Sequence, residues 1–361
     1  MKRVYIDEAQ DFIIGHPDRV PVYEGFAGIT ALLKFPRIYL TGTLPPQLLK
    51  QFCRKTESPD NIHVIRASTD RPELGYNAIL LDPQNSGINI VTSAYTLAVA
   101  LRTLLKTHEK ILVFFETVEN VEYFCSKDQR TTAKYHARMS EPLKKDSLNK
   151  WDAGSMKILA ATTAVAYGLD RPDVRFVIAC GIGHGMITLV QELGRGGRDG
   201  KFAHTFTMDD QSISYISSKQ DETLRSAASA FLHSTSICKR QLILAVMDGF
   251  SHTCLEDKFC NPCDICYPNS IMKRFAMEAV VDNKIPAPAR VPTHPFDLSP
   301  LPSISSQSSS CISSSGSFMF SAEMAEELDR VESRLIAQKG KGKEREREDA
   351  SDPVYKDLPC P

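Results

Sequence analysis

Short, nearly continuous apolar runs recur along the first two-thirds of the chain and are separated by helix-like stretches. Two of them, Val4–Ile6 and Ile38–Leu40, lie near the N-terminus, and three longer ones span residues 111–115, 157–161 and 175–179. Runs that are apolar at successive positions, rather than at every second one, are typical of strands buried on both faces. Buried strands that alternate with helices predict an α/β fold built on parallel sheets.

Changes in this pattern predict four regions. Residues 1–75 contain the first two strand-like runs, and residues 76–215 repeat the alternation of strand and helix more fully. Residues 216–270 show helical periodicity followed by a group of cysteines. Beyond them the chain becomes rich in Pro, Ser and charge, a composition that cannot bury a core. We therefore predict a disordered tail over residues 271–361.

Composition narrows the class of protein only a little. The chain has 361 residues, 42% of them hydrophobic and 24% charged, with a net charge of -1. These values are ordinary for a soluble protein, and they neither support nor exclude nucleic-acid binding. No apolar stretch approaches the length of a membrane span, and the N-terminus turns acidic before a signal-peptide core. We expect an intracellular protein, whose ten cysteines are thiols or metal ligands rather than disulfides.

The most specific motif is the string Q-E-L-G-R-G-G-R-D-G over Gln191–Gly200. Its two arginines, Arg195 and Arg198, are three positions apart with glycines between them. Such spacing places two rigid guanidinium groups near a phosphate with little steric hindrance, and arginines of this kind stabilise charge on a phosphoryl group in transfer. A glycine-rich basic turn without a function is the alternative, and it explains this string poorly.

Three other motifs follow predicted strands. Asp7 and Glu8 could present one acid to Mg²⁺ and another to an attacking water. Thr41-Gly42-Thr43 supplies small hydroxyl groups, which can sense a nucleotide site. The segment Ala161–Asp170 offers hydroxyl and backbone N–H groups to a phosphate backbone. Taken singly, the first two motifs are better explained as an ordinary strand end and an ordinary turn.

Taken in order, these strings resemble the RecQ family of superfamily 2 DNA helicases over about residues 1–270. The Arg-Pro-x-Leu and Tyr-His-Ala strings are characteristic of RecQ proteins rather than of helicases in general. The matching strings are Asp7–Gln10 at the Walker B position, Thr41–Thr43, Arg71–Leu74, Tyr135–Ala137, Ala161–Asp170 and Gln191–Gly200.

The resemblance implies ATP-dependent, 3′-to-5′ unwinding of DNA, in repair and recombination in the nucleus, with single-stranded or forked DNA as the partner. It implies a partial first RecA-like domain and a complete second one, which clamp ATP between them. Asp7 would hold Mg²⁺ through water, Glu8 would orient the attacking water, and Arg195 and Arg198 would reach the γ-phosphate. The other residues that it places at the nucleotide are Gly168, Asp170 and Gln191, and those that it places at DNA are Thr41, Thr43, His136, Thr162 and Thr163.

The sequence also departs from the family pattern. Gln10 replaces the usual His, the loop over residues 11–16 has no Trp, and Ala166 stands where Gly is usual. No G-x-x-x-x-G-K-[ST] loop precedes Asp7, so the chain resembles the C-terminal two-thirds of such a helicase. Because that loop fixes the phosphates of ATP, we expect no useful ATP hydrolysis by this chain alone. We also expect DNA binding to be weak, salt-sensitive and independent of base sequence.

Five cysteines lie between residues 238 and 266. Cys263 and Cys266 have the spacing of a chelate pair for tetrahedral Zn²⁺, and Cys238 precedes them on a predicted helix. The RecQ resemblance implies a small helical zinc-binding subdomain with four Cys ligands at this place. The spacing in eukaryotic members favours Cys254 as the remaining ligand, and the spacing in bacterial members favours Cys260. We predict Cys254, with Cys260 as the alternative.

Three functions are consistent with these features. The leading hypothesis is a RecQ-like helicase. The second is a non-catalytic nucleic-acid-binding or regulatory protein derived from a helicase, which would bind DNA tightly without ATPase activity. The third is a zinc-dependent interaction module whose motor-like part is only a scaffold.

Overall fold

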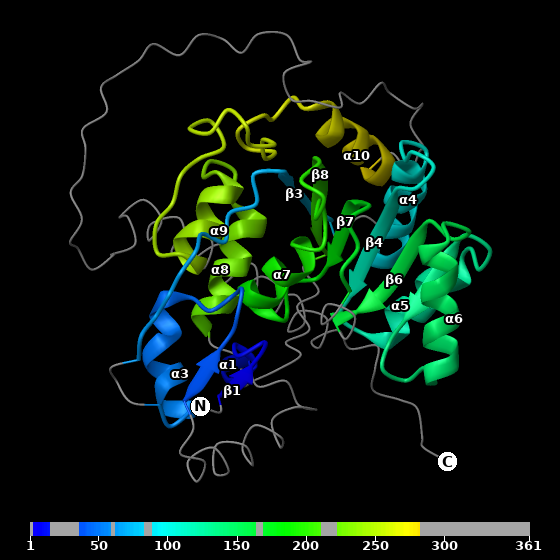
Figure 1. Cartoon of the computed structure of the whole chain (residues 1–361). Coiled ribbons are helices and arrows are strands. Elements are labelled where there is room, and N and C mark those ends of the chain that lie inside the picture. Colours follow the sequence, from blue (N-terminus) through cyan, green and yellow to red (C-terminus); the bar gives the residue numbers. More distant parts are fainter. Residues whose placement is uncertain are drawn as a thin grey trace, which may run out of the picture. The chain divides into compact units, whose positions relative to one another are not determined.

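The computed structural model describes residues 3–14, 36–58, 62–82, 89–163, 169–210 and 222–281. Gly168 and the predicted tail beyond residue 281 lie outside these ranges. The described elements are drawn in colour in Figure 1.

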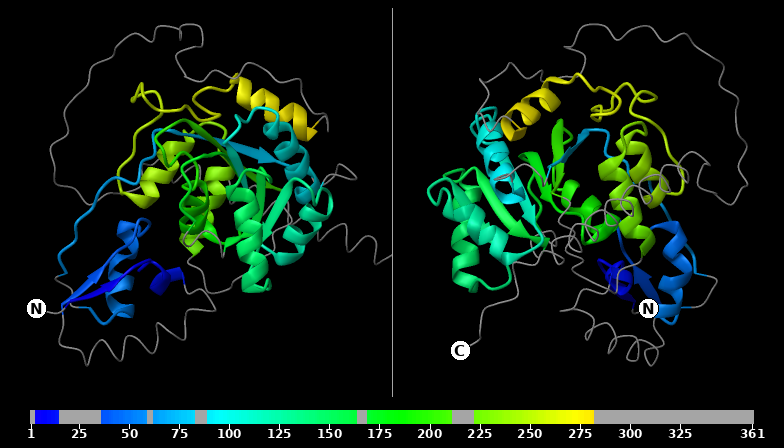
Figure 2. Two further views of the ribbon diagram at one scale, coloured as in Figure 1. Left: turned by 45° about the vertical axis from the view of Figure 1, so that its right-hand side comes forward. Right: turned by 180° about the vertical axis from the view of Figure 1, so that it is seen from behind.

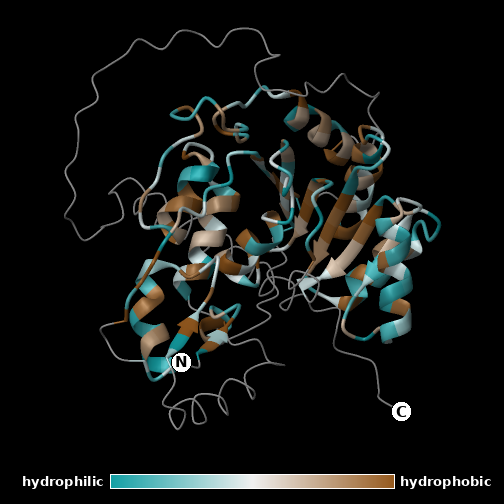
Figure 3. Ribbon diagram, viewed as in Figure 1, coloured by the Kyte–Doolittle hydropathy of each residue, from teal (hydrophilic) through white to brown (hydrophobic). Residues whose placement is uncertain are grey.

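A six-stranded parallel sheet, in the order β3-β8-β7-β4-β6-β5, forms the centre of the fold (Figure 1). The predicted class of parallel α/β structure is therefore confirmed. Every residue of β4, β6 and β7 is buried, as their continuous apolar sequences predict, and these strands are strongly hydrophobic in Figure 3. The strands are β3 (Leu74–Leu80), β4 (Lys110–Phe115), β5 (Thr132–Tyr135), β6 (Ile158–Thr162), β7 (Val174–Cys180) and β8 (Ala203–Asp209).

Helices follow the strands of this sheet. Thr117 caps α5 by accepting a hydrogen bond from the backbone N–H of Asn120 at 3.2 Å. Asn89 caps α4 in the same way, at 2.8 Å from Thr92. The helices are α4 (Ile90–Arg102), α5 (Val118–Ser126), α6 (Glu141–Asp152), α7 (Gly185–Leu193), α8 (Glu222–His233), α9 (Lys239–Met247) and α10 (Ile271–Val281).

Helix α10 corrects one predicted boundary. Residues 271–281 were expected to begin a disordered tail, but they form a helix that lies beside α4 (Figure 2). Met272, Phe275 and Val280 belong to the same hydrophobic core as α4 and the sheet. Apolar residues at helical spacing supply enough burial to order this segment, and the Pro- and Ser-rich composition begins only after it.

The N-terminal part contains a separate pair of parallel strands, β1 and β2, which agree with the predicted runs to within a residue. Phe12, Tyr39 and Phe52 pack edge to face in a small aromatic cluster, with ring centroids 5.1 to 6.2 Å apart. The elements are β1 (Val4–Ile6), α1 (Asp11–Ile14), β2 (Arg37–Tyr39), η1 (Pro46–Leu48) and α3 (Leu49–Lys55).

Residues 248–270, which we call the cysteine module, have no helix or strand and lie against edge strand β3. The Asp264 carboxylate accepts a hydrogen bond from the backbone N–H of Ala78 at 3.0 Å, and the Asp264 N–H donates to the Tyr76 carbonyl at 2.9 Å. Asn261 donates from its side chain to the Ala203 carbonyl at 3.1 Å. The module thus satisfies backbone groups that an uncovered edge strand would leave exposed.

Candidate functional site

The two predicted arginines lie in residues 194–200, which we call the arginine loop. This loop joins α7 to β8 and turns sharply at Gly197, whose φ is +62°. A Cβ atom at Gly197 would lie 2.9 Å from the Lys201 carbonyl oxygen and from Cγ of Glu73. Glycine is therefore required at this position for both backbone conformation and space.

Arg71, at the start of the Arg-Pro-x-Leu string, braces the arginine loop. Its Nη1 donates to the Gly194 carbonyl and its Nη2 to the Gly196 carbonyl, each at 2.9 Å. Its Nε is paired with Glu73. One planar guanidinium therefore holds the two carbonyls that flank Arg195.

A second brace comes from β7. The buried Arg175 side chain donates to the Asp199 carboxylate at 2.6 Å and to the Lys201 carbonyl at 3.0 Å. The loop is thus held at both ends by arginines that lie outside it. The sequence singled out the loop and the Arg71 string, but it gave no sign of Arg175.

The structure brings Arg195, Arg198 and Asp170 together. Arg195 is buried and donates to the Leu169 carbonyl at 3.1 Å. Arg198 is exposed and pairs with the Asp170 carboxylate at 2.7 Å. The hydrogen bond and charge of Arg198 lower the pKa of Asp170, so this carboxylate stays ionised.

A chain of hydrogen bonds runs from the predicted catalytic acid to α7. Gln10 donates to the Glu8 carboxylate at 2.8 Å and accepts from the Thr41 hydroxyl at 2.6 Å. The Thr41 hydroxyl accepts from the backbone N–H of Thr43 at 3.1 Å, and Gln191 donates to the Thr43 hydroxyl at 3.1 Å. Gln10 both donates and accepts here, which a neutral His in its place could also do.

Glu8 itself has a left-handed backbone, with φ of +51°. Such a conformation is uncommon for a non-glycine residue and costs roughly 1–3 kcal/mol. Its neighbour Asp7 is exposed, and the Asp7 carboxylate accepts the backbone N–H of Glu8 at 2.9 Å. Both acids lie at the carboxyl end of β1, as predicted.

The residues that the resemblance places at DNA differ in their exposure. Thr41 is exposed and Thr163 is half-buried, whereas Thr43, Thr162 and His136 are buried. Tyr135 pairs with Ala161 in the sheet, so the strand ends that carry His136 and Thr162 are neighbours. The His136 ring is 2.8 Å from the Glu122 carboxylate, an arrangement that suits a positioning role better than an exposed contact.

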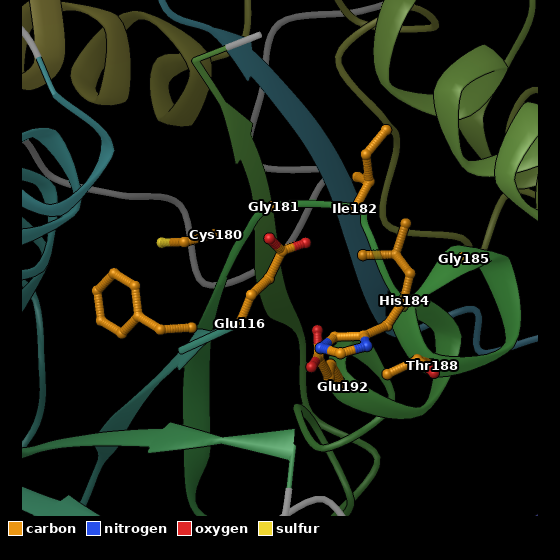
Figure 4. Close-up of a pocket in the computed structure, with 10 residues that line it drawn as sticks. Glu116, Cys180, Gly181, Ile182, His184, Gly185, Thr188 and Glu192 are labelled. Atoms are coloured by element: carbon orange, nitrogen blue, oxygen red, sulfur yellow. The ribbon is translucent and has the colours of Figure 1, made fainter. Parts of the chain in front are cut away.

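Sequence reasoning missed a pair of acids at the ends of β4 and α7, the half-buried Glu116 and the buried Glu192. Glu116 accepts the backbone N–H of Gly183 at 2.5 Å, and its burial raises its pKa to about 7. Burial, with the nearby charge of Glu116, raises the pKa of Glu192 well above its ordinary value. Both line one small pocket with Cys180 and His184 (Figure 4). The only signal in the sequence was an acid directly after a buried strand.

The four predicted zinc ligands come together. The Sγ atoms of Cys238, Cys254, Cys263 and Cys266 all lie within 4.8 Å of one another, and we call this set the cysteine cluster. The Sγ of Cys238 is 3.5 Å from that of Cys254 and 3.7 Å from that of Cys263. Zn–S bonds of about 2.3 Å in a tetrahedron give S···S distances of about 3.8 Å, so the donor set fits Zn²⁺.

Cys260, the alternative ligand, lies outside this cluster. Its Sγ is 3.6 Å from the Asp257 carboxylate, and burial raises its pKa to about 12. The geometry therefore favours Cys254.

The two residues after Cys238 anchor the cluster to the rest of the fold, a role that their sequence did not reveal. The buried Lys239 ammonium donates to the carbonyls of Leu232 and Ser234 at 3.1 and 3.0 Å, at the end of α8. The fully buried Arg240 donates to the Leu74 carbonyl at 2.7 Å.

Comparison with known proteins assigns the class first. The family model described as "Helicase conserved C-terminal domain" matches residues 96–200, from α4 through the arginine loop, so this part of the chain is a helicase C-terminal domain. RecQ-family DNA helicases are among the proteins to which this chain is similar at modest identity, and the predicted resemblance to that family is confirmed.

Two of these relatives show how much is matched. The ATP-dependent DNA helicase hus2/rqh1 of Schizosaccharomyces pombe is 26% identical over 306 residues, which cover 78% of this chain and 22% of that protein. The ATP-dependent DNA helicase Q4 of Mus musculus is 43% identical over 70 residues, which cover 19% of this chain and 6% of that protein. The chain thus spans only a minor part of these relatives.

Among solved structures, Dbp5 of S. cerevisiae bound to RNA and ADP BeF3 is 14% identical. Its TM-score is 0.48, and the match covers 64% of this chain and 57% of that chain. No helix in the described part of the chain is both long and apolar enough to cross a bilayer.

Proposed function

We propose that this chain is the motor segment of a RecQ-like DNA helicase that couples ATP hydrolysis to 3′-to-5′ unwinding. Residues 1–75 would be part of the first RecA-like domain and residues 76–215 the second, with a zinc-binding subdomain over residues 216–270. The observation that carries the proposal is the arginine loop. It is braced by Arg71 and Arg175 and presents the exposed Arg198 beside Asp170.

ATP and Mg²⁺ would be held by residues at the strand ends and in the arginine loop. When bound, Mg²⁺ supplies positive charge that neutralises the phosphates. Asp7 would hold the ion through water and Glu8 would orient the attacking water, while Arg195 and Arg198 would face the γ-phosphate. Arg198 would first have to leave Asp170, since the two are paired. Gly168, Asp170 and Gln191 would complete the nucleotide site.

The chain from Glu8 to Gln191 supports this assignment. It joins the acid beside the attacking water to the helix that leads into the arginine loop. A change at the γ-phosphate that moved Glu8 would therefore reach α7 through Gln10 and the two threonines. The same threonines would lie near DNA together with His136, Thr162 and Thr163.

DNA is the proposed partner, as single strands or forks in the nucleus, and contacts to phosphates make binding independent of base sequence. We also propose one Zn²⁺ per chain in the cysteine cluster, as a closed structural site. A base-sequence preference emerging from a binding selection would contradict the proposed mode of DNA contact.

The decisive experiment measures DNA-stimulated ATP hydrolysis. We expect no useful turnover by this chain, and robust turnover by a fusion that adds a P-loop-bearing first domain. Turnover by the fusion should be abolished by Glu8→Gln and greatly reduced by Arg198→Ala, but unchanged by Arg130→Ala, an exposed arginine in the same domain. Robust turnover by the unfused chain, abolished by Glu8→Gln, would show that its nucleotide site is built differently.

The second candidate function is non-catalytic binding of nucleic acid. It is favoured by the departures from the family pattern within the chain, where Gln10 replaces the usual His and the loop over residues 11–16 has no Trp. Tight DNA binding combined with an inactive fusion would support this candidate over the helicase.

A further inference from the structure

Two arginines, Arg240 and Arg71, connect the cysteine cluster to the arginine loop through successive hydrogen bonds. The Nη1 of Arg240 donates to the carbonyl of Arg71 at 2.9 Å, and the guanidinium of Arg71 donates in turn to Gly194 and Gly196. We propose that Arg71 is a positioning residue for the arginine loop, and that Arg240 makes its position depend on the cysteine cluster.

The bidentate geometry at Arg71 is what fixes the loop. Its two terminal nitrogens each reach a different carbonyl, and these carbonyls lie on either side of Arg195. The planar fork thereby sets the direction of the backbone through the residue between them. A lysine could keep the charge and its pairing with Glu73, but its single ammonium lacks this planar fork.

Arg240 fixes the backbone from which Arg71 extends. It is fully buried, pairs with Asp70, and donates to the carbonyls of Arg71 and Leu74. Its guanidinium also lies 5.2 Å from the centre of the Tyr76 ring. A buried charge with this many partners has one well-defined position, because any other would leave it unpaired.

The cysteine cluster fixes the position of the Arg240 backbone. Cys238 is the residue just before α9, and Arg240 is the second residue of that helix. Asn261, in the segment between Cys254 and Cys263, donates its backbone N–H to the Pro72 carbonyl at 2.6 Å and accepts from Arg240 at 3.3 Å. Ordering of the cluster therefore orders residues 70–74 from two directions, and Arg71 passes that order to the arginine loop.

Hydrogen–deuterium exchange on the full chain tests this without relying on activity. The amides of the loop are protected by bonds such as Gly197 N–H to the Val174 carbonyl. Arg71→Ala should speed exchange over residues 194–200 by at least about tenfold, because two charge-assisted bonds are lost. Exchange in β4 should not change. Arg71→Lys should give most of the same effect, and exposed Arg130→Ala none.

The link to the cluster is tested by non-additivity. Removing zinc from the wild-type chain with a chelator should also speed exchange over residues 194–200, and in Arg71→Ala it should add little further increase. Arg240→Lys should mimic the chelator while metal analysis shows zinc retained. The chelator experiment rests on the proposed zinc site. Metal analysis of the wild-type chain shows whether zinc is present, so absence of the zinc site can be distinguished from absence of the Arg71 brace.

Three results would overturn the inference. Unchanged exchange over residues 194–200 in a folded Arg71→Ala variant would show that Arg71 does not hold the arginine loop. If that variant does not fold, unchanged loop exchange in Arg71→Lys would do the same. Equal acceleration by the chelator in wild type and in the Arg71 variant would show that the cluster does not act through Arg71.

Discussion

The six-stranded sheet and the cysteine module of this chain are held together by different forces. In the sheet, β4, β6 and β7 are buried along their whole length between helices. In the module, Phe250, Leu255 and Phe259 are 51%, 54% and 70% exposed. The cysteine cluster, to which the module contributes three of the four sulfur atoms, takes the place of an apolar core there.

This contrast shows how a short segment can become an ordered part of a large domain. A segment of this size buries too little apolar surface to offset the entropy of ordering its chain, so it needs a cross-link such as a metal site. The cysteine cluster provides one, and backbone hydrogen bonds from Asn261 and Asp264 to the edge of β3 provide the docking. The module and the sheet should therefore respond to different perturbations.

The largest effect should follow loss of the metal. Cys263→Ser should lower bound zinc from about one per chain to nearly none and remove exchange protection from the module, since structural zinc contributes on the order of 10 kcal/mol. Metal analysis of the purified variant measures this. Cys254→Ser should behave alike, and Cys260→Ser should keep its zinc. Well under one zinc in the wild-type chain, or loss of zinc only in the Cys260 variant, would contradict the assigned ligands.

The converse test creates a cavity in the sheet. Phe114, in the central strand β4, is 1% exposed, so Phe114→Ala should lower the free energy of unfolding by about 3–5 kcal/mol. Urea unfolding can be followed through the single, fully buried Trp151. Zinc content should not change. Leu143→Ala, at a position 58% exposed, is the matched control and should leave stability nearly unaltered.

A smaller effect should depend on pH. Burial raises the pKa of Glu116 to about 7, so between the ordinary pKa of 4.5 and that value the folded state holds more protons than the unfolded state. Stability should therefore fall as pH rises through this window, with a contribution of about 1–3 kcal/mol. Urea titrations across it should show a shallower fall for Glu116→Gln. Exposed Glu141→Gln is the control, and a slope in Glu116→Gln equal to wild type would refute the assignment.

The smallest effect should come from the surface of α6. Lys150 and Asp146 form an ion pair at 2.6 Å, with side chains 49% and 56% exposed. Lys150→Ala should change the free energy of unfolding by no more than about 0.5 kcal/mol, because water screens such pairs. A loss comparable to that of Phe114→Ala, measured in the same urea titration, would mean that this surface matters to the sheet far more than its exposure indicates.

What the sequence predicted well was local. The continuous apolar runs predicted β4, β6 and β7, because a strand that is buried on both faces has apolar residues at successive positions. Strands β3, β5 and β8 were missed. In β3 and β8, polar residues such as Asn77 and Thr205 interrupt the apolar pattern and are satisfied by partners elsewhere in the sheet. The spacing of the cysteines left Cys254 and Cys260 unresolved, and only the folded backbone separates them.

The braces of the arginine loop were beyond prediction for a different reason. Arg71, Arg175 and Arg240 act on backbone carbonyls far away in the chain, and a carbonyl carries no sequence signature. The resemblance to a family identified the loop and the string that contains Arg71. It did not show that one touches the other.

The position of β3 also sets the order of events during synthesis. Among the described strands β3 pairs only with β8, in a register that joins Leu74 to Ala203, so it leaves the ribosome long before its partner exists. Until then its backbone groups are open to wrong pairings, and closing so long a loop slows folding. The segment that covers the other side of β3 is made later still. A nascent chain of this protein should therefore depend on chaperones until residues beyond 264 have emerged, after which the sheet closes and its edge is covered.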